Sequence, residues 1–147
     1  MMEHVVYILA SGIGCAGVSL IFNAKKGKVV LAAISSMVIS SVYIVLTNYS
    51  DNLILNKMLC AMLATAYAEI ISRVLKAPST VFLLPSIIPL VPGGSLYFTM
   101  SGIINGDNAL AKLNANNTIE SAVGIGIGIV IVSAIVTGLG LFRKKIR

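Results

Sequence analysis

Apolar residues fill five long stretches of this 147-residue chain, and short polar segments separate them. A bilayer core about 30 Å thick requires roughly 20 apolar residues per transmembrane helix. Each stretch is long enough when Lys57 and Glu69 are accepted within the third. The pattern therefore predicts an all-α integral membrane protein of one domain, residues 1–147, with about five transmembrane helices. The expected spans are about 5–23, 29–48, 53–72, 79–104 and 120–142.

The composition supports this class of protein. Hydrophobic residues make up 57% of the chain and charged residues 11%, whereas soluble proteins carry roughly 25% charged residues. The formal net charge of +6 raises the alternative of nucleic-acid binding, which requires a basic patch with interleaved aromatic residues. The cations instead lie at the ends of spans. We therefore expect membrane lipid around the chain and no nucleic-acid partner.

The charged residues alternate in sign from one inter-span segment to the next. Lys and Arg follow the first, third and fifth spans, whereas most acidic residues lie at the N-terminus or in the second and fourth loops. The cations after these spans are Lys25, Lys26, Lys28, Arg73, Lys76, Arg143, Lys144, Lys145 and Arg147. Because cytoplasmic loops carry the excess of Lys and Arg, the pattern predicts an outside N-terminus and a cytoplasmic C-terminus.

The fourth loop, residues 105–120, is rich in Asn and Ala. We expect it to be a surface connector without evident chemistry. Asp107 is placed to cap a short helix that runs through Lys112, because Asp accepts hydrogen bonds from the first amides of a helix.

Small residues recur within the spans. Gly124 and Gly128 form a small-xxx-small pair in the fifth span, which is typical of close contact between membrane helices. The surrounding GIGIGIV run resembles a phosphate-binding loop, but it lies inside an apolar segment and follows no soluble strand, so helix packing is favoured. Ser36 and Ser40 share one face of the second span. They either bond to a neighbouring helix or line a polar path.

The fourth span contains residues that break helices. Pro85, Pro89 and Pro92 are three of the four prolines in the chain, and Gly93 and Gly94 follow directly. Proline lacks an amide donor and collides with the carbonyl four residues before it. The freed backbone groups are tolerated at membrane depth only where they are buried in protein or line a wet cavity. The segment 91–95 is therefore predicted to interrupt the helix near the middle of the span.

An interrupted membrane helix offers a site for an anionic ligand. Gly93 and Gly94 permit positive φ and close approach of a ligand to the backbone. Ser95 is placed to cap a second half-helix over about 96–103, whose first amides would attract a carboxylate. Tyr97 either donates its hydroxyl to that ligand or packs against another helix. The alternative is that the prolines only kink the helix and the glycines only allow close packing.

Glu69 is the only acidic residue inside a span. A membrane-buried ionisable residue is a candidate for function, here as a proton carrier. Arg73 follows four residues later, in the order that favours a helical ion pair, so structural pairing is the competing interpretation. Lys57 either extends to the outer surface or meets a carboxylate that enters from that side.

Groups for enzymatic chemistry are missing from the sequence. The only histidine, His4, lies near the terminus, and no Cys, His or carboxylate cluster has the spacing of a metal site or an activated nucleophile. We therefore expect no enzymatic activity, no catalytic residue, no metal and no cofactor.

Three segments together resemble a known transporter family. They are IIPLVPGGSLYFTM at 87–100, SRVLKAPSTVF at 72–82 and the pair Phe22 and Asn23. They are similar to the threonine/serine exporter (ThrE) family, and in particular to its small YjjB-like subunit, which corresponds to the C-terminal half of the fused exporters. The residues that carry over as motif positions are Pro89, Pro92, Gly93 and Gly94.

The resemblance implies secondary export of threonine and serine across a bacterial cell (plasma) membrane. It also implies a larger membrane partner equivalent to the N-terminal half of the fused exporters, a small carboxylate-bearing substrate and no nucleotide. Two alternatives stay open: a subunit of a dicarboxylate (succinate-type) exporter, and a scaffold that stabilises the partner without transporting. Assembly of this chain into a homo-oligomer is a further alternative.

Overall fold

The computed structural model describes residues 2–22 and 26–145, which fold into helices. In chain order these are α1 (Met2–Ile21), α2 (Lys26–Tyr49), α3 (Leu53–Leu75), α4 (Thr80–Ile87), the 3-10 helix η1 (Ile88–Leu90), α5 (Gly93–Asn105) and α6 (Asn108–Lys145). Asn23, Lys25 and Arg147, on which some of the sequence interpretation rests, lie outside the described residues.

Four of the described helices, α1, α2, α3 and α6, are each long and apolar enough to cross a membrane. The α4–η1 segment and α5 form a fifth candidate span that is bent by 52° at a short break. The predicted fold class, an all-α membrane protein with about five spans and a broken fourth one, is confirmed.

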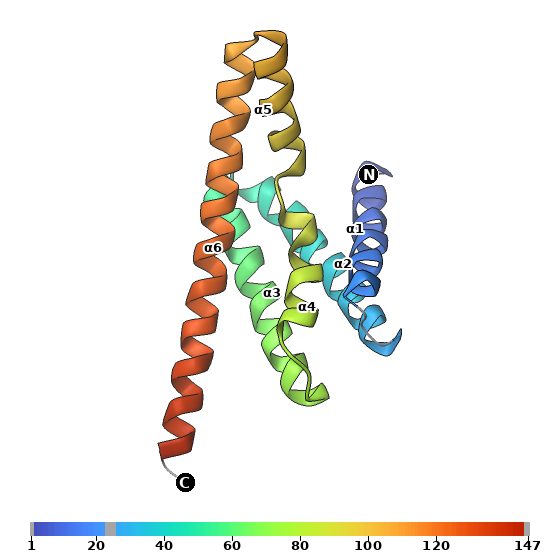
Figure 1. Ribbon diagram of the computed structural model, residues 1–147, viewed down its shortest axis with the longest axis vertical. Coiled ribbons are helices and arrows are strands. Elements are labelled where there is room, and N and C mark those ends of the chain that lie inside the picture. The colour runs from blue at the N-terminus through green and yellow to red at the C-terminus, as the bar shows by residue number, and fades with distance from the viewer. Residues whose placement is uncertain (1, 23–25, 146–147) are drawn as a thin grey trace.

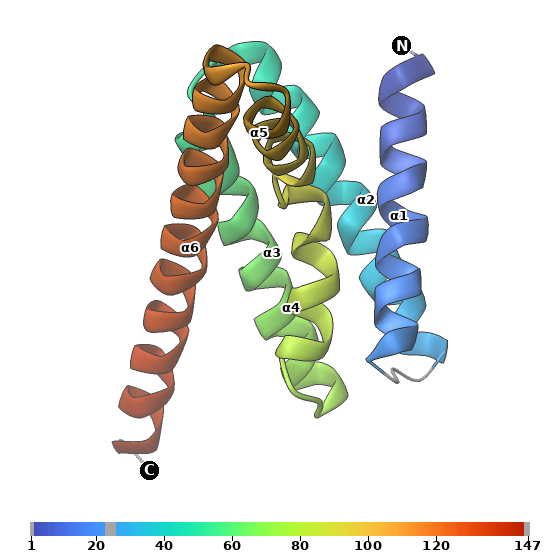
Figure 2. The same ribbon diagram turned by 45° about the horizontal axis from the view of Figure 1, so that its top comes forward.

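The helices pack mainly in neighbouring pairs. Helix α6 lies along α3, α1 lies along α2, and α4 lies beside α1, α2 and α3 (Figures 1 and 2). Helix α5 runs antiparallel to the first part of α6, and this hairpin rises above the turn between α2 and α3 (Figure 1). With 38 residues at 1.5 Å each, α6 is about 57 Å long, well beyond the thickness of a bilayer core.

The helix expected to run through Lys112 in the connector of residues 105–120 is longer than predicted, because residues 108–120 are the first part of α6. Only Gly106 and Asp107 separate α5 from α6, and Gly106 adopts the left-handed conformation (φ 73°) that reverses the chain. The expected cap is present, because the Asp107 Oδ1 accepts the Leu110 amide at 3.0 Å. Residues 108–120 contain neither Gly nor Pro, so nothing ends the helix that Asp107 starts.

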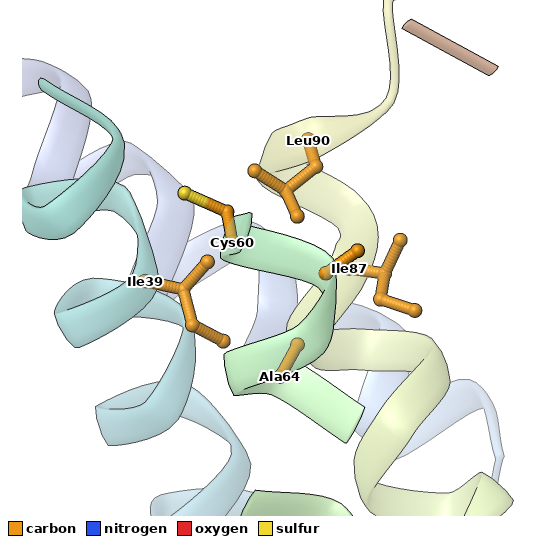
Figure 3. Packing of buried hydrophobic residues seen from close by; sticks show 6 residues of the cluster. Ile39, Cys60, Ala64, Ile87 and Leu90 are labelled. Atoms are coloured by element: carbon orange, nitrogen blue, oxygen red, sulfur yellow. The ribbon is translucent and has the colours of Figure 1, made fainter. Parts of the chain in front are cut away.

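The core lies where the upper part of α4 meets α2 and α3. Figure 3 shows Ile87 and Leu90 near Cys60 and Ala64 of α3, with Ile39 of α2 beside them. Leu90 and Cys60 have no exposed surface. The core thus fixes the last residues before the break against α3.

Two glycines of α6 allow it to approach α3 closely. A Cβ atom added at Gly124 would lie 2.6 Å from the Ile54 carbonyl oxygen, and one at Gly128 would lie 2.5 Å from the Met58 carbonyl oxygen. At Gly126 such an atom would meet nothing within 4 Å. The interpretation of Gly124 and Gly128 as a helix-packing pair is therefore confirmed.

Two serines of α2 bond to neighbouring helices. Ser36 donates its hydroxyl to the Ser11 carbonyl of α1 at 3.0 Å, and Ser35 bonds to Ser86 of α4. Ser40 is fully buried without a hydrogen-bond partner among the described residues. For Ser36 the interpretation as an interhelical contact is the correct one.

Candidate functional site

The break between α4–η1 and α5 is a two-residue joint. Val91 is extended (φ −62°, ψ 128°), and Pro92 (φ −78°, ψ 54°) directly precedes α5. Pro89 and Pro92 lack amide donors and disfavour helix at this segment, and here the α-helix stops, whereas Pro85 lies inside α4. The Pro/Gly motif therefore ends one helix and starts another, as the sequence predicted.

Two details of the predicted joint are wrong. Helix α5 begins at Gly93, so Ser95 lies inside its first turn and does not cap it. Proline has the φ angle of a helix start, and this places the start directly after Pro92. Gly93 and Gly94 have negative φ, since Gly106 is the only described glycine with a positive value. A Cβ atom at either would meet nothing within 4 Å, so both border open space.

The joint leaves two main-chain carbonyls without amide partners. In a continuous helix, Pro89 and Leu90 would accept hydrogen bonds from the amides of Gly93 and Gly94, four residues later. Instead the Gly93 amide donates to the Val91 carbonyl at 2.8 Å. An unpaired carbonyl at membrane depth costs several kcal/mol, so both oxygens need other donors.

Side chains from two other helices supply those donors. The Tyr7 hydroxyl of α1 donates to the Pro89 oxygen at 2.8 Å, and the Lys57 Nζ of α3 donates to the Leu90 oxygen at 3.0 Å. The break is thus held from both sides, by a phenol and by an ammonium group.

Lys57 is buried, with 6% of its surface exposed. Its Nζ lies 4.1 Å from the centroid of the Tyr43 ring, which is the arrangement of a cation–π contact. None of the described carboxylates forms an ion pair with it. Of the two interpretations of this residue, extension to the outer surface is wrong: the break offers a carbonyl acceptor in the interior that the sequence pattern did not reveal.

The start of α5 provides further donors. The Leu96 amide bonds to the Pro92 carbonyl at 3.0 Å, but the amides of Gly94 and Ser95 make no hydrogen bond to the described residues. Free amides in the first turn carry the positive end of the helix dipole. This end of α5 therefore suits an anion.

Lys57 and the start of α5 border one cavity of about 320 Å³. Its lining comes from α1, α2, α3, η1, the joint, α5 and α6, and contains no Asp or Glu. The lining residues are Tyr7, Tyr43, Leu53, Lys57, Pro89, Val91, Pro92, Gly93, Gly94, Ser95, Asn117 and Ser121. The cavity lining combines one cation with several neutral donors.

The cavity lies near one end of the bundle. Tyr7 is in the second turn of α1 and Lys57 in the second turn of α3, while Ser121 marks where the charge-free part of α6 begins. The break itself, at Val91 and Pro92, lies midway along the broken span that runs from Thr80 to Asn105, as the sequence predicted.

The structure brings most of the predicted site residues together. Pro89, Pro92, Gly93, Gly94 and Ser95 all line the cavity. Tyr97 does not: it is 67% exposed and packs edge-on against Phe98.

The predicted pair on α3 lies apart from this cavity. Glu69 is half-buried, Arg73 is exposed, and neither lines the cavity. No ion pair joins them in the described part of the chain.

Sequence reasoning missed the residues that other helices bring to the site, namely Tyr7, Tyr43, Asn117 and Ser121. One signal in the sequence pointed to the site. Lys57 is a cation inside a span, and such residues mark functional sites in membrane proteins.

Two other hollows lie on the surface of α3, one shared with α2 and one with α2 and α6. Their volumes are about 350 and 400 Å³, and Val42 and Leu63 line both. Their walls are almost entirely apolar, so lipid chains or a packing helix suit them better than a polar ligand. Among the described residues, no group of three His, Cys, Asp or Glu side chains could hold a metal ion.

The chain matches a family of known transporters. The family model described as "Threonine/Serine exporter, ThrE" covers residues 7–135, which include the whole cavity. No curated protein and no solved structure matches the chain. Because the match extends over most of the sequence, the chain belongs to the threonine/serine exporter family.

Proposed function

We propose that this chain is the small membrane subunit of a secondary exporter of threonine and serine and works with a larger membrane partner. The substrate enters the cavity at the helix break, with its carboxylate toward Lys57 and the first turn of α5. Membership of the exporter family supports the reaction class.

The observation that carries this proposal is the buried cation without a counter-ion. Removing an ammonium group from water is costly unless it is paired. Lys57 has one carbonyl partner and one aromatic partner, and the cavity wall holds no acid that would neutralise it. A substrate carboxylate would provide the missing charge.

What the cavity lacks supports the proposal of a larger partner. It is open, and only Lys57, Tyr7, Tyr43, Ser95, Asn117 and Ser121 present polar side-chain atoms to it. A second protein would close it and supply further substrate contacts. We place the pair in the bacterial plasma membrane with the N-terminus outside and the C-terminus cytoplasmic, on the charge asymmetry of the loops. The cavity then faces outward, where an exported substrate leaves.

Two alternatives rest on specific observations. A cationic cavity without an acid also suits a dicarboxylate of the succinate type. The close α3–α6 contact at Gly124 and Gly128 suits a scaffold that stabilises its partner and transports nothing.

The deciding experiment is tracer efflux from proteoliposomes that contain this chain alone, the larger exporter subunit alone, or both. Labelled threonine and labelled succinate are compared in each preparation. The proposal predicts threonine efflux only from the pair. Succinate efflux from the pair would support the dicarboxylate alternative, and equal threonine efflux from the larger subunit alone would make this chain a scaffold.

A further inference from the structure

Lys57 donates its ammonium group to the Leu90 carbonyl. An anionic ligand in the cavity would bind the same ammonium group. We infer that the cavity binds a zwitterionic α-amino acid by an exchange of contacts. The Lys57 Nζ leaves the Leu90 carbonyl oxygen and binds the substrate carboxylate, and the substrate ammonium group then donates to the Leu90 oxygen in place of Lys57. This inference rests on the proposed function and adds how the site recognises the substrate ammonium group as well as its carboxylate.

The first half of the exchange follows from charge. A hydrogen bond between two ionised groups is stronger than one between an ammonium group and a neutral carbonyl. Lys57 is buried, so water screens the attraction to an entering carboxylate only weakly. Its long side chain is also the part most able to move, because Leu90 is held in the core with no exposed surface.

The second half follows from the need of the Leu90 carbonyl for a hydrogen-bond donor. Once Lys57 leaves, the Leu90 oxygen loses its donor, because the Gly94 amide, which would bond to it in a continuous helix, makes no such bond here. An α-ammonium group supplies the missing donor and lies next to the carboxylate in the same molecule. A dicarboxylate brings no donor and would leave this carbonyl unpaired, which a buried site resists. The exchange therefore favours amino acids over dicarboxylates.

The test is protection of a reporter thiol from alkylation, which needs no transport. Val91 lines the cavity, is 56% exposed and forms no side-chain hydrogen bond, so Val91→Cys introduces a thiol at the mouth of the site. The native Cys15 and Cys60 have no exposed surface and should react slowly. Membranes that contain the full chain together with the larger subunit are treated with N-ethylmaleimide, and the labelling rate of the introduced thiol is followed.

Four probes separate the two halves of the exchange: L-threonine, L-threoninamide, 3-hydroxybutyrate and succinate. The exchange predicts that threonine slows labelling. Threoninamide lacks the carboxylate, and the two acids lack the ammonium group. These three compounds should therefore protect the thiol only at concentrations about tenfold higher or more. Equal protection by threonine and threoninamide, or stronger protection by succinate, would overturn the inference. These comparisons use one folded protein and need no change at Lys57.

The role of Lys57 itself is tested in the same background. Lys57→Met should abolish protection by threonine, Lys57→Arg should retain it, and Lys112→Met, at an exposed lysine of α6, should match the parent. Protection that survives in Lys57→Met would overturn the assignment. If threonine protects in no variant while the proteoliposome pair still exports it, this cavity is not the substrate site and the proposed export function stands without it.

Discussion

Lys57 and Leu90 lie 33 residues apart in the chain, yet the Lys57 Nζ donates to the Leu90 carbonyl oxygen at 3.0 Å. The relationship joins two features that each cost free energy inside a membrane protein. One is a buried cation, and the other is a carbonyl freed by a proline-containing break. Each satisfies the other in the absence of substrate, and an amino acid carries both groups needed to replace the contact.

Removal of the Tyr7 hydroxyl tests the second hydrogen bond that holds the break, from Tyr7 to the Pro89 carbonyl. Tyr7→Phe removes the only donor to the Pro89 oxygen among the described side chains and should destabilise the protein by about 1 kcal/mol. The loss should be local, so hydrogen exchange should accelerate at Gly93 and Leu96, whose amides are hydrogen-bonded next to the break. Tyr49→Phe, at a residue that is 87% exposed, is the control. Equal exchange rates in the two variants would show that Tyr7 does not hold the joint.

The two faces of the glycine run in α6 should respond differently to alanine. Gly128→Ala places a Cβ atom against the Met58 carbonyl and should lower the free energy of unfolding by about 1–3 kcal/mol, as overpacking does. Gly126→Ala meets nothing and gains helix propensity, so it should be neutral or slightly stabilising. Unfolding in detergent measures both. The packing account fails if Gly126→Ala is the more damaging substitution.

Gly93 borders the cavity without being packed. Gly93→Val is tolerated by the backbone, because φ is negative and the added Cβ atom meets nothing within 4 Å. The branched side chain would nevertheless occupy space next to Lys57 and the α5 amides. We expect insertion and stability close to wild type but loss of most threonine efflux, with Gly126→Val as the matched control. Wild-type efflux from Gly93→Val would exclude the cavity as the substrate site.

Glu69 lies on α3 outside the cavity. Since it neither lines the site nor pairs with Arg73, Glu69→Gln should leave threonine efflux and its dependence on pH within about twofold of wild type, the range of weak surface substitutions. Measurement of efflux at several external pH values checks this. A flattened pH profile would instead identify Glu69 as the proton carrier.

The fold could largely be predicted from the sequence because it depends on local properties. Charge-free stretches give the spans, and Gly124 and Gly128 at a four-residue spacing predict close contact with another helix, which the structure identifies as α3. The helix in the fourth loop was predicted too short for a local reason too: the Asn-rich composition suggests a loop, but it contains no residue that stops a helix capped by Asp107.

The candidate site could be predicted only for the segment that contains the break. The segment from Pro89 to Ser95 predicts an interruption, because proline lacks an amide donor and glycine is conformationally permissive. Tyr7 and Lys57 take part through contacts 82 and 33 residues distant in sequence, and no pattern along a single chain reports which helices surround the joint. Tyr97 was expected at the site because it follows the glycines, but the helix starts at Gly93 and directs it elsewhere.

The most direct test of the account is labelled-threonine efflux from proteoliposomes that contain the larger subunit with equal amounts of folded Lys57→Met, Lys112→Met or unaltered chain. Loss of a buried charge partner costs about 2–5 kcal/mol, so Lys57→Met should lower efflux by at least about tenfold. Lys112→Met should match the unaltered chain. Undiminished efflux from Lys57→Met would contradict the claim that the cavity at the helix break binds the substrate carboxylate.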